Sequence, residues 1–137
     1  MCKKSNDVGK IYRTTDGYFT SSYRIKKPRR VAIIYQRKDD KAIAVVKIYS
    51  KKNKSGNPYI SKLVLKPNKH PSLTEDSIVG KRLIIGKKEN ESYKAIYTED
   101  FINLNDKVTR RELKKIKKAI KKINKNKIKK WQKHFRK

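Results

Sequence analysis

Two apolar runs separated by a short polar turn constrain the fold of this chain more than any other feature. Val31–Tyr35 reads VAIIY, Ala42–Tyr49 reads AIAVVKIY, and the turn between them holds Asp39 and Asp40. Both runs are rich in Val and Ile, and neither alternates regularly between apolar and polar residues, as a strand with one wet face would. They predict two neighbouring strands that are buried on both faces and therefore lie in the middle of a sheet.

Five other short runs rich in Val, Ile and Tyr lie between turn signals and also predict strands. Because most of these runs have no helical pattern between them, they indicate a small curled antiparallel sheet or a partly open barrel. A short helical piece is expected near Leu73–Ile78 or near Glu99–Asn103. The seven predicted strands are Val8–Arg13, Tyr18–Tyr23, Arg30–Gln36, Ala42–Tyr49, Tyr59–Leu65, Lys81–Ile85 and Tyr93–Thr98.

The clearest helical signal lies in the C-terminal part of the chain. Thr109 and Glu112 have the spacing of a capping box, in which each side chain bonds the backbone amide of the other residue. Apolar residues then recur at steps of three and four, which predicts an amphipathic helix over about 110–123. Asn124 and Asn126 are weaker helix formers that can bend or end it, and a second set of helical turns is expected through 135. The apolar face of the first helix comprises Leu113, Ile116, Ala119, Ile120 and Ile123.

The predicted fold class is therefore α+β, a small curled antiparallel sheet followed by a basic amphipathic helix. We expect one domain over residues 1–137. It divides into a β-rich body over 8–106 and a basic C-terminal helical arm over 107–137.

The charge of the chain is strongly positive and unevenly distributed. Forty Lys and Arg residues against 12 Asp and Glu give a formal net charge of +28, and the C-terminal arm alone holds 16 basic residues and a single acid, Glu112. Packing of an amphipathic helix explains its apolar face but not such a surplus of lysine. The surplus predicts a polyanionic partner, with nucleic acid favoured over an acidic membrane surface.

Composition also argues against several classes of protein. No run approaches the roughly 20 apolar residues that span a bilayer, and the first ten residues hold no apolar stretch like that of a signal peptide. We therefore expect a cytoplasmic protein with no membrane partner. One cysteine, Cys2, allows no internal disulfide, and its distance from His70 and His134 provides no zinc-binding spacing. No metal and no cofactor are expected.

The segment Tyr49–Tyr59, YSKKNKSGNPY, is the richest candidate for chemistry because it leaves a buried strand and enters a turn. It carries the hydroxyl of Ser50 and the lysines Lys51, Lys52 and Lys54. Cations at the end of a strand, held by a rigid sheet, can neutralise a phosphate in a transition state. The alternative is that this is only a solvated, lysine-rich hairpin loop.

A second basic segment, Arg24–Arg30, reads RIKKPRR and follows several aromatic residues. It is either an ordinary solvated loop or a surface for single-stranded RNA, where cations follow the phosphates and rings stack on bases. His70 is a possible general acid or base, although a loop histidine between prolines usually has no chemical role. The predicted RNA-binding residues are Tyr23, Arg24, Lys26, Lys27, Arg29, Arg30, Lys54, Tyr59, Arg110, Arg111, Lys114 and Lys118.

Five segments, taken in order, resemble the small endoribonuclease toxins of the MazF/PemK type. Within that superfamily the chain is most similar to the toxins of type III toxin–antitoxin systems, the ToxN, CptN and TenpN group. The resemblance covers roughly residues 8–123. It rests on Gly9–Tyr12 (GKIY), Lys27–Tyr35 (KPRRVAIIY), Ala44–Lys52 (AVVKIYSKK), Asp76–Ile85 (DSIVGKRLII) and the helix that opens at Thr109.

This resemblance implies an SH3-like barrel with helices that cleaves RNA without a metal ion, leaving a 2′,3′-cyclic phosphate and a 5′-hydroxyl. Ser50 and Lys52 match the family's hydroxyl-plus-lysine strand end. Tyr49 stands where a second small hydroxyl often lies and Lys51 where a proline can lie, so either Lys51 or Lys52 is the reacting cation.

The resemblance also implies particular partners. These are RNA substrates such as mRNA and a small structured RNA antitoxin that holds the toxin in a protein–RNA assembly. Two alternatives remain open at this point. One is a non-catalytic, basic RNA-binding module, and the other is a type II MazF/PemK toxin held by an acidic protein antitoxin.

Overall fold

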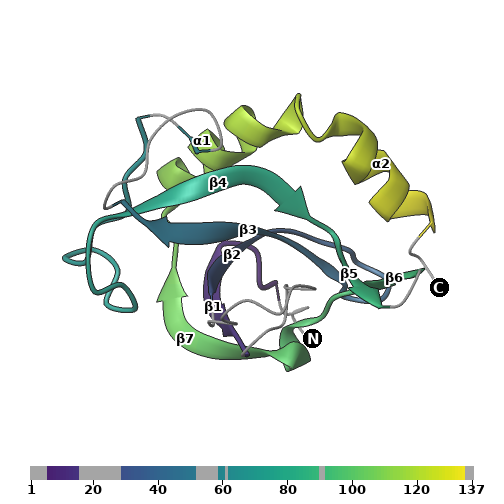
Figure 1. Cartoon of the computed structure of the whole chain (residues 1–137), viewed down its shortest axis with the longest axis horizontal. Coiled ribbons are helices and arrows are strands. Elements are labelled where there is room, and N and C mark those ends of the chain that lie inside the picture. The colour runs from purple at the N-terminus through teal and green to yellow at the C-terminus, as the bar shows by residue number, and fades with distance from the viewer. Residues whose placement is uncertain (1–5, 16–28, 52–58, 61, 90–91, 135–137) are drawn as a thin grey trace, which may run out of the picture.

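The protein is built on a five-stranded antiparallel sheet with the strand order β4-β3-β2-β1-β7. The computed structural model of the chain describes residues 6–15, 29–51, 59–60, 62–89 and 92–134. Two helices lie across one face of the sheet, and β5 and β6 pair as a separate hairpin (Figure 1). The elements are β1 (Lys10–Thr14), β2 (Arg30–Gln36), β3 (Ile43–Ser50), β4 (Ser77–Ile84), β5 (Gly86–Glu89), β6 (Ser92–Ala95), η1 (Thr98–Asp100), β7 (Phe101–Lys107), α1 (Arg110–Lys121) and α2 (Lys125–His134).

The α+β class with a small antiparallel sheet is confirmed, but the sheet is open. In the part of the chain that the structure describes, β4 and β7 are its two edges and do not pair with each other.

No helix among these residues is both long and apolar enough to cross a membrane.

The prediction that the two apolar runs form central strands is confirmed. β2 lies between β1 and β3, and β3 lies between β2 and β4. Val31, Ala32, Ile33 and Ile34 on β2 are all fully buried, so this strand has no wet face along most of its length.

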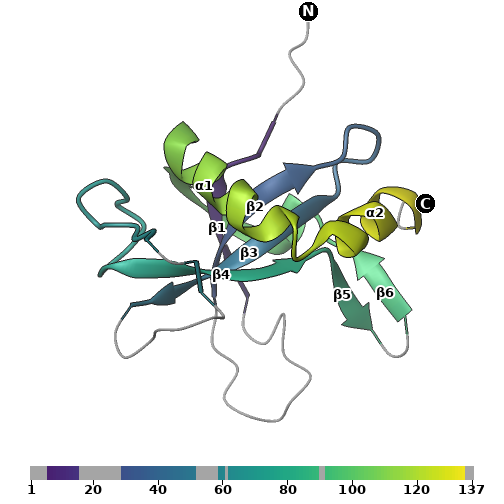
Figure 2. The ribbon, with the colours of Figure 1, turned by 90° about the horizontal axis from the view of Figure 1, so that it is seen from above.

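The buried side chains form two clusters, one on each face of the sheet. The helix-side face carries the larger cluster, which includes Ile34, Val46, Ile116, Ile120 and Trp131. Figure 2 shows α1 and α2 running across the strands on this face. The opposite face carries a smaller cluster of Tyr12, Val31, Ile33, Ile43, Val45, Ile96 and Phe101.

The C-terminal helices follow the predicted pattern with one correction. Thr109 and Glu112 form the capping box, with each side chain bonded to the other residue's backbone amide. The helix breaks at Asn124, whose buried side-chain amide donates to the carbonyls of Lys81 (3.0 Å) and Ile120 (2.9 Å). α1 ends at Lys121, and Ile123, in the turn between the two helices, is 64% exposed and does not join the apolar face as predicted.

The predicted strand Tyr59–Leu65 is wrong. Its described residues form only two isolated bridges, from Tyr59 to Gly80 and from Leu65 to Ser77. Lys62 has a φ of 61°, which breaks an extended backbone, and the apolar side chains of the segment enter the helix-side cluster instead.

Two further expectations need correction. The segment Leu73–Ile78 is not helical, because β4 begins at Ser77 and extends the strand predicted at Lys81–Ile85 toward the N-terminus. Near Glu99 there is only the single 3₁₀ turn η1, and an unpredicted edge strand, β7, follows it directly. The predicted strand Tyr18–Tyr23 lies outside the described residues.

Candidate functional site

Cations and tyrosines gather on the opposite face of the sheet, where β2 begins and β3 ends. Lys47 pairs with Val31 in the β2–β3 register, and Val31 belongs to the cluster on that face. The guanidinium of Arg29, just before β2, lies 5.5 Å from the ring centroid of Tyr49. Lys47 and Tyr49 are two residues apart on one strand, so they share this face.

Two tyrosine rings stack edge to face beside these cations. The ring centroids of Tyr49 and Tyr59 are 5.3 Å apart, with an angle of 79° between the ring planes. The bridge from Tyr59 to Gly80 holds the second ring against the sheet. Burial raises the pKa of the Tyr49 phenol, against the opposing effect of Arg29, so the phenol is neutral at physiological pH.

A break in strand register brings a third cation, Arg82, close to Lys47. Val46 pairs with Leu83 and Ile48 pairs with Val79, so residues 80–82 of β4 bulge opposite Lys47. We call Arg29, Lys47, Tyr49, Tyr59 and Arg82 the Lys47 cluster.

The environment of Lys47 makes it a better proton donor than a surface lysine. Its side chain is half-buried. The pKa of its ammonium is lowered from the usual 10.5. Burial is the largest cause, and repulsion from the guanidinium groups of Arg29 and Arg82 adds to it. An anionic ligand placed here would meet three cations at once and would relieve their mutual repulsion.

Two of the predicted catalytic residues, Ser50 and Lys51, lie at the end of β3 and outside this cluster. The Ser50 hydroxyl donates to the carboxylate of Glu75. Ser50 follows Tyr49 directly on the strand, so its side chain leaves from the helix-side face. Lys51 is exposed, and its backbone amide donates to the carbonyl of Asp76 (2.9 Å). Lys52 lies outside the described residues, so a strand-end catalytic lysine stays a prediction.

The predicted RNA-binding residues fall into separate groups. Arg29 and Tyr59 belong to the Lys47 cluster, whereas Arg30 lies on the helix-side face, where its Nε donates to the carbonyl of Ser72 (2.8 Å). The α1 residues are all exposed: Arg110, Arg111, Lys114 and Lys118. The others lie outside the described residues: Tyr23, Arg24, Lys26, Lys27 and Lys54.

His70 lies in the 67–73 loop, as its sequence context predicted, and is a buried residue there. The ring is fully buried, with Nδ1 3.2 Å from the Asp106 carboxylate and Nε2 2.9 Å from that of Glu112. Ser72 also donates to Asp106 through its hydroxyl (2.5 Å). Burial raises the pKa of the Asp106 carboxyl, but the hydrogen bonds it accepts, the strongest from Ser72, lower it overall. These hydrogen bonds link β7, through Asp106, and the start of α1, through Glu112, to the 67–73 loop.

A metal site is not evident within the described ranges. No three His, Cys, Asp or Glu side chains there are arranged to hold a metal ion. The ring nitrogens of His70 are already used in hydrogen bonds to the two carboxylates.

Sequence reasoning missed Lys47 and Arg82. The signal for Lys47 was a single charged residue inside the otherwise apolar run AIAVVKIY. Arg82 gave no such signal, because it reaches Lys47 only through the bulge between β3 and β4, which no local pattern marks.

A scan against protein-family models finds no match to this chain, and a search of the curated proteins finds no match either.

Proposed function

We propose that this protein is an endoribonuclease that cleaves single-stranded RNA at the Lys47 cluster. The observation that carries the proposal is a half-buried lysine between two arginines, beside a pair of stacked tyrosines, on a rigid central strand. Cations fixed by a sheet suit the charge that develops on a phosphate, and tyrosine rings suit unpaired bases.

The reaction uses the 2′-hydroxyl of the RNA as nucleophile. Its oxygen forms a new bond to the adjacent phosphorus, its proton passes to water, and the bond from phosphorus to the 5′-oxygen breaks. Arg29 and Arg82 stabilise the extra negative charge of the five-coordinate phosphorus, and Lys47 donates a proton to the departing 5′-oxygen. The products are a 2′,3′-cyclic phosphate and a 5′-hydroxyl.

The chain's resemblance to MazF/PemK-like toxins, and to their type III branch in particular, supports this reaction. On that basis we propose that the open sheet is a variant of the SH3-like barrel. We also propose that the enzyme acts in the cytoplasm and is inhibited by a small structured RNA in a protein–RNA assembly. The exposed cations of α1, Arg110, Arg111, Lys114 and Lys118, then bind the phosphates of that RNA.

The test is cleavage of a labelled, unstructured RNA by the purified protein, with mapping of the product ends. We expect a 2′,3′-cyclic phosphate and a 5′-hydroxyl, and no cleavage when the scissile nucleotide is 2′-deoxy. Lys47→Ala should lower the cleavage rate by about 10²–10³-fold, as loss of a group that stabilises transition-state charge does. Lys66→Ala is the matched control, because Lys66 is an exposed lysine outside the cluster.

Two results would contradict the assignment. RNA binding without cleavage by the wild-type protein would make it a non-catalytic RNA-binding module. Full cleavage by Lys47→Ala, with loss in Lys51→Ala or Lys52→Ala, would move the chemistry to the strand end predicted from the sequence.

A further inference from the structure

The Lys47 cluster reaches the outer edge of the sheet at one level of β4. Lys47 follows Val46, whose partner on β4 is Leu83. Arg82 directly precedes Leu83, in the bulge opposite Lys47. Two of the three cations of the cluster therefore lie at the level of Leu83, on a strand that is an edge of the sheet among the described residues.

Polar side chains from α2 and from the turn before it bond the backbone of β4 at this level. Asn124 Nδ2 donates to the carbonyl of Lys81 (3.0 Å), and Lys127 Nζ donates to the carbonyl of Leu83 (2.9 Å). The backbone amide of Leu83 donates to Asn124 Oδ1 (3.4 Å). These contacts take the place that a further strand would have at the edge, and they bring the ammonium of Lys127 beside β4.

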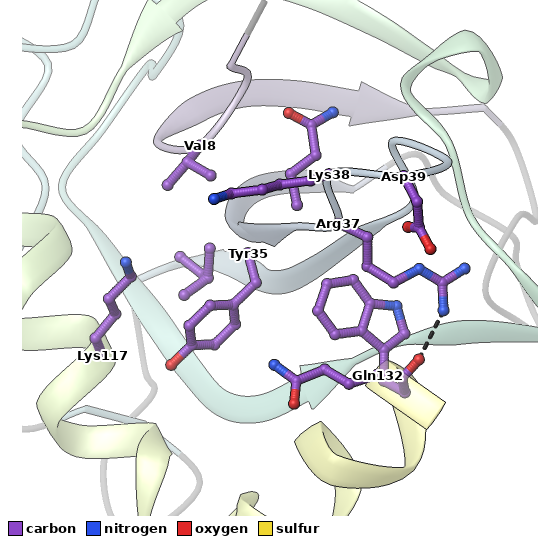
Figure 3. A pocket seen from close by; sticks show the side chains of 10 residues that line it. Val8, Tyr35, Arg37, Lys38, Asp39, Lys117 and Gln132 are labelled. Carbon is purple, nitrogen blue, oxygen red and sulfur yellow. Dashed lines mark hydrogen bonds between the residues drawn. The ribbon is translucent and has the colours of Figure 1, made fainter. Parts of the chain in front are cut away.

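A second attachment fixes α2 nearer its C-terminal end. The backbone carbonyl of Trp131 accepts from Nη1 of Arg37 (2.6 Å), the bond drawn as a dashed line in Figure 3. The guanidinium carbon of Arg37 also lies 5.3 Å from the centroid of the indole ring, and both residues are buried. Because α2 is held to the sheet on both sides of Lys127, the fold sets the position of this lysine.

Lys127 resembles Lys47 in its electrostatic environment. Its side chain is half-buried, and the pKa of its ammonium is lowered, mainly by burial and further by repulsion from Arg82. Arg82 has the same effect on Lys47, so it lies near both lysines. A lysine ammonium has three donors, and the bond to Leu83 uses one of them. A phosphate bound beside Lys127 would accept from another donor and relieve the repulsion.

We propose that a single-stranded RNA bound at the Lys47 cluster continues around the β4 edge to α2, where Lys127 binds a backbone phosphate outside the cluster. The proposal rests on the proposed function in assuming that RNA occupies the cluster. The path leads from one face of the sheet around a single edge strand toward the helix-side face. A base-paired helix is too stiff for such a turn, whereas an unpaired strand can follow cations along it.

The experiment measures binding without cleavage, by fluorescence anisotropy with labelled 2′-O-methyl RNA, which lacks the nucleophilic hydroxyl. Two unstructured oligonucleotides of about four and about twelve nucleotides cover the range of site sizes for single strands. Lys127→Met removes the charge and keeps an unbranched apolar side chain. We expect it to weaken binding of the longer RNA by about tenfold and to reduce its salt slope by about 0.7. Binding of the shorter RNA should not change.

Lys129→Met is the matched control. Lys129 is an exposed lysine of the same helix, and two residues along a helix place it on a different side from Lys127. This variant loses the same charge and should bind both RNAs as the wild type does. Lys127→Arg keeps the charge and a donor, so it should restore binding of the longer RNA.

Three results would overturn the proposal. Equal weakening of both RNA lengths by Lys127→Met would assign this lysine only a structural role at the β4 edge. A loss no larger than that of Lys129→Met would show a general effect of charge, and an equal loss with an RNA duplex would show that the bound RNA is not an unpaired strand. If the wild type does not cleave RNA, the proposed reaction is wrong, but a loss confined to the longer single strand would still support this path.

Discussion

Lys47 occupies a strand position that would ordinarily hold an apolar residue. Val46 and Ile48 on either side of it are buried in the helix-side cluster, and Val31 lies opposite it. A charged side chain at such a site is held in an environment that disfavours its charge. Perturbed ionisable groups of this kind are concentrated at functional sites.

The lowered pKa of Lys47 predicts a specific pH dependence of RNA cleavage. If the protonated lysine is the active form, cleavage falls as pH rises through its pKa, which lies below the usual 10.5. Lys47→Arg keeps its charge over this range, so its residual cleavage should persist to higher pH. Rates measured across mildly alkaline pH, corrected for uncatalysed hydrolysis, give the comparison. An identical alkaline limb in both proteins would show that another group titrates.

At the level of elements, His70 joins three segments that are distant in sequence. The side chains of its two partners are 6% exposed for Asp106 and 13% exposed for Glu112. Removing the ring leaves two buried carboxylates facing each other without a donor between them. The imidazole is therefore one of the links, together with the Ser72 hydroxyl, between the 67–73 loop, the β7 edge and the start of α1.

His70→Ala should consequently lower the free energy of unfolding by about 3 kcal/mol, because it leaves a cavity and takes a hydrogen-bond partner from two mostly buried carboxylates. The matched variant Thr109→Ala removes only a helix cap and should cost about 1 kcal/mol. Urea unfolding followed by circular dichroism measures both. A larger loss in Thr109→Ala than in His70→Ala would show that the His70 contacts contribute little.

The elements that could be predicted from sequence are those whose pattern is local. The central strands follow from two Val- and Ile-rich runs, and α1 follows from its capping box and apolar spacing. Strand β7 could not be predicted, because Phe101–Lys107 (FINLNDK) is a largely exposed edge strand with a polar composition. Tyr59–Leu65 has the composition of a strand, yet the positive φ of Lys62 interrupts its extended backbone.

The candidate site was predictable only in part, because the contacts that assemble it are not local in the sequence. Arg29 and Tyr59 could be identified because each lies in a basic or aromatic run. Their meeting with Lys47 and Arg82 depends on the β2–β3 register and on the bulge between β3 and β4. Register is a property of two strands together, so a single segment does not reveal it.

For the whole molecule, the net charge of +28 should make RNA binding steeply dependent on salt. Each phosphate contact contributes about −0.7 to −0.9 to the slope of log affinity against log salt concentration. If the exposed cations of α1 each bind one phosphate, replacing all four by alanine should reduce that slope by about 3. The replaced residues are Arg110, Arg111, Lys114 and Lys118.

Fluorescence anisotropy with a structured RNA over a series of potassium chloride concentrations measures this slope. Because these four side chains are exposed, the variant should fold as the wild type does. An unchanged slope in the folded variant would place the RNA elsewhere on the protein.

The Lys47 cluster lies on the face of the sheet opposite to α1, which carries the exposed cations Arg110, Arg111, Lys114 and Lys118. A long folded RNA that bound both the cluster and the cations of α1 would gain from linkage, because binding at the first site raises the effective concentration at the second, by factors on the order of 10²–10⁴ in affinity. On the proposed function, such a layout would let the protein release short cleaved fragments quickly while it retains a folded inhibitor for much longer.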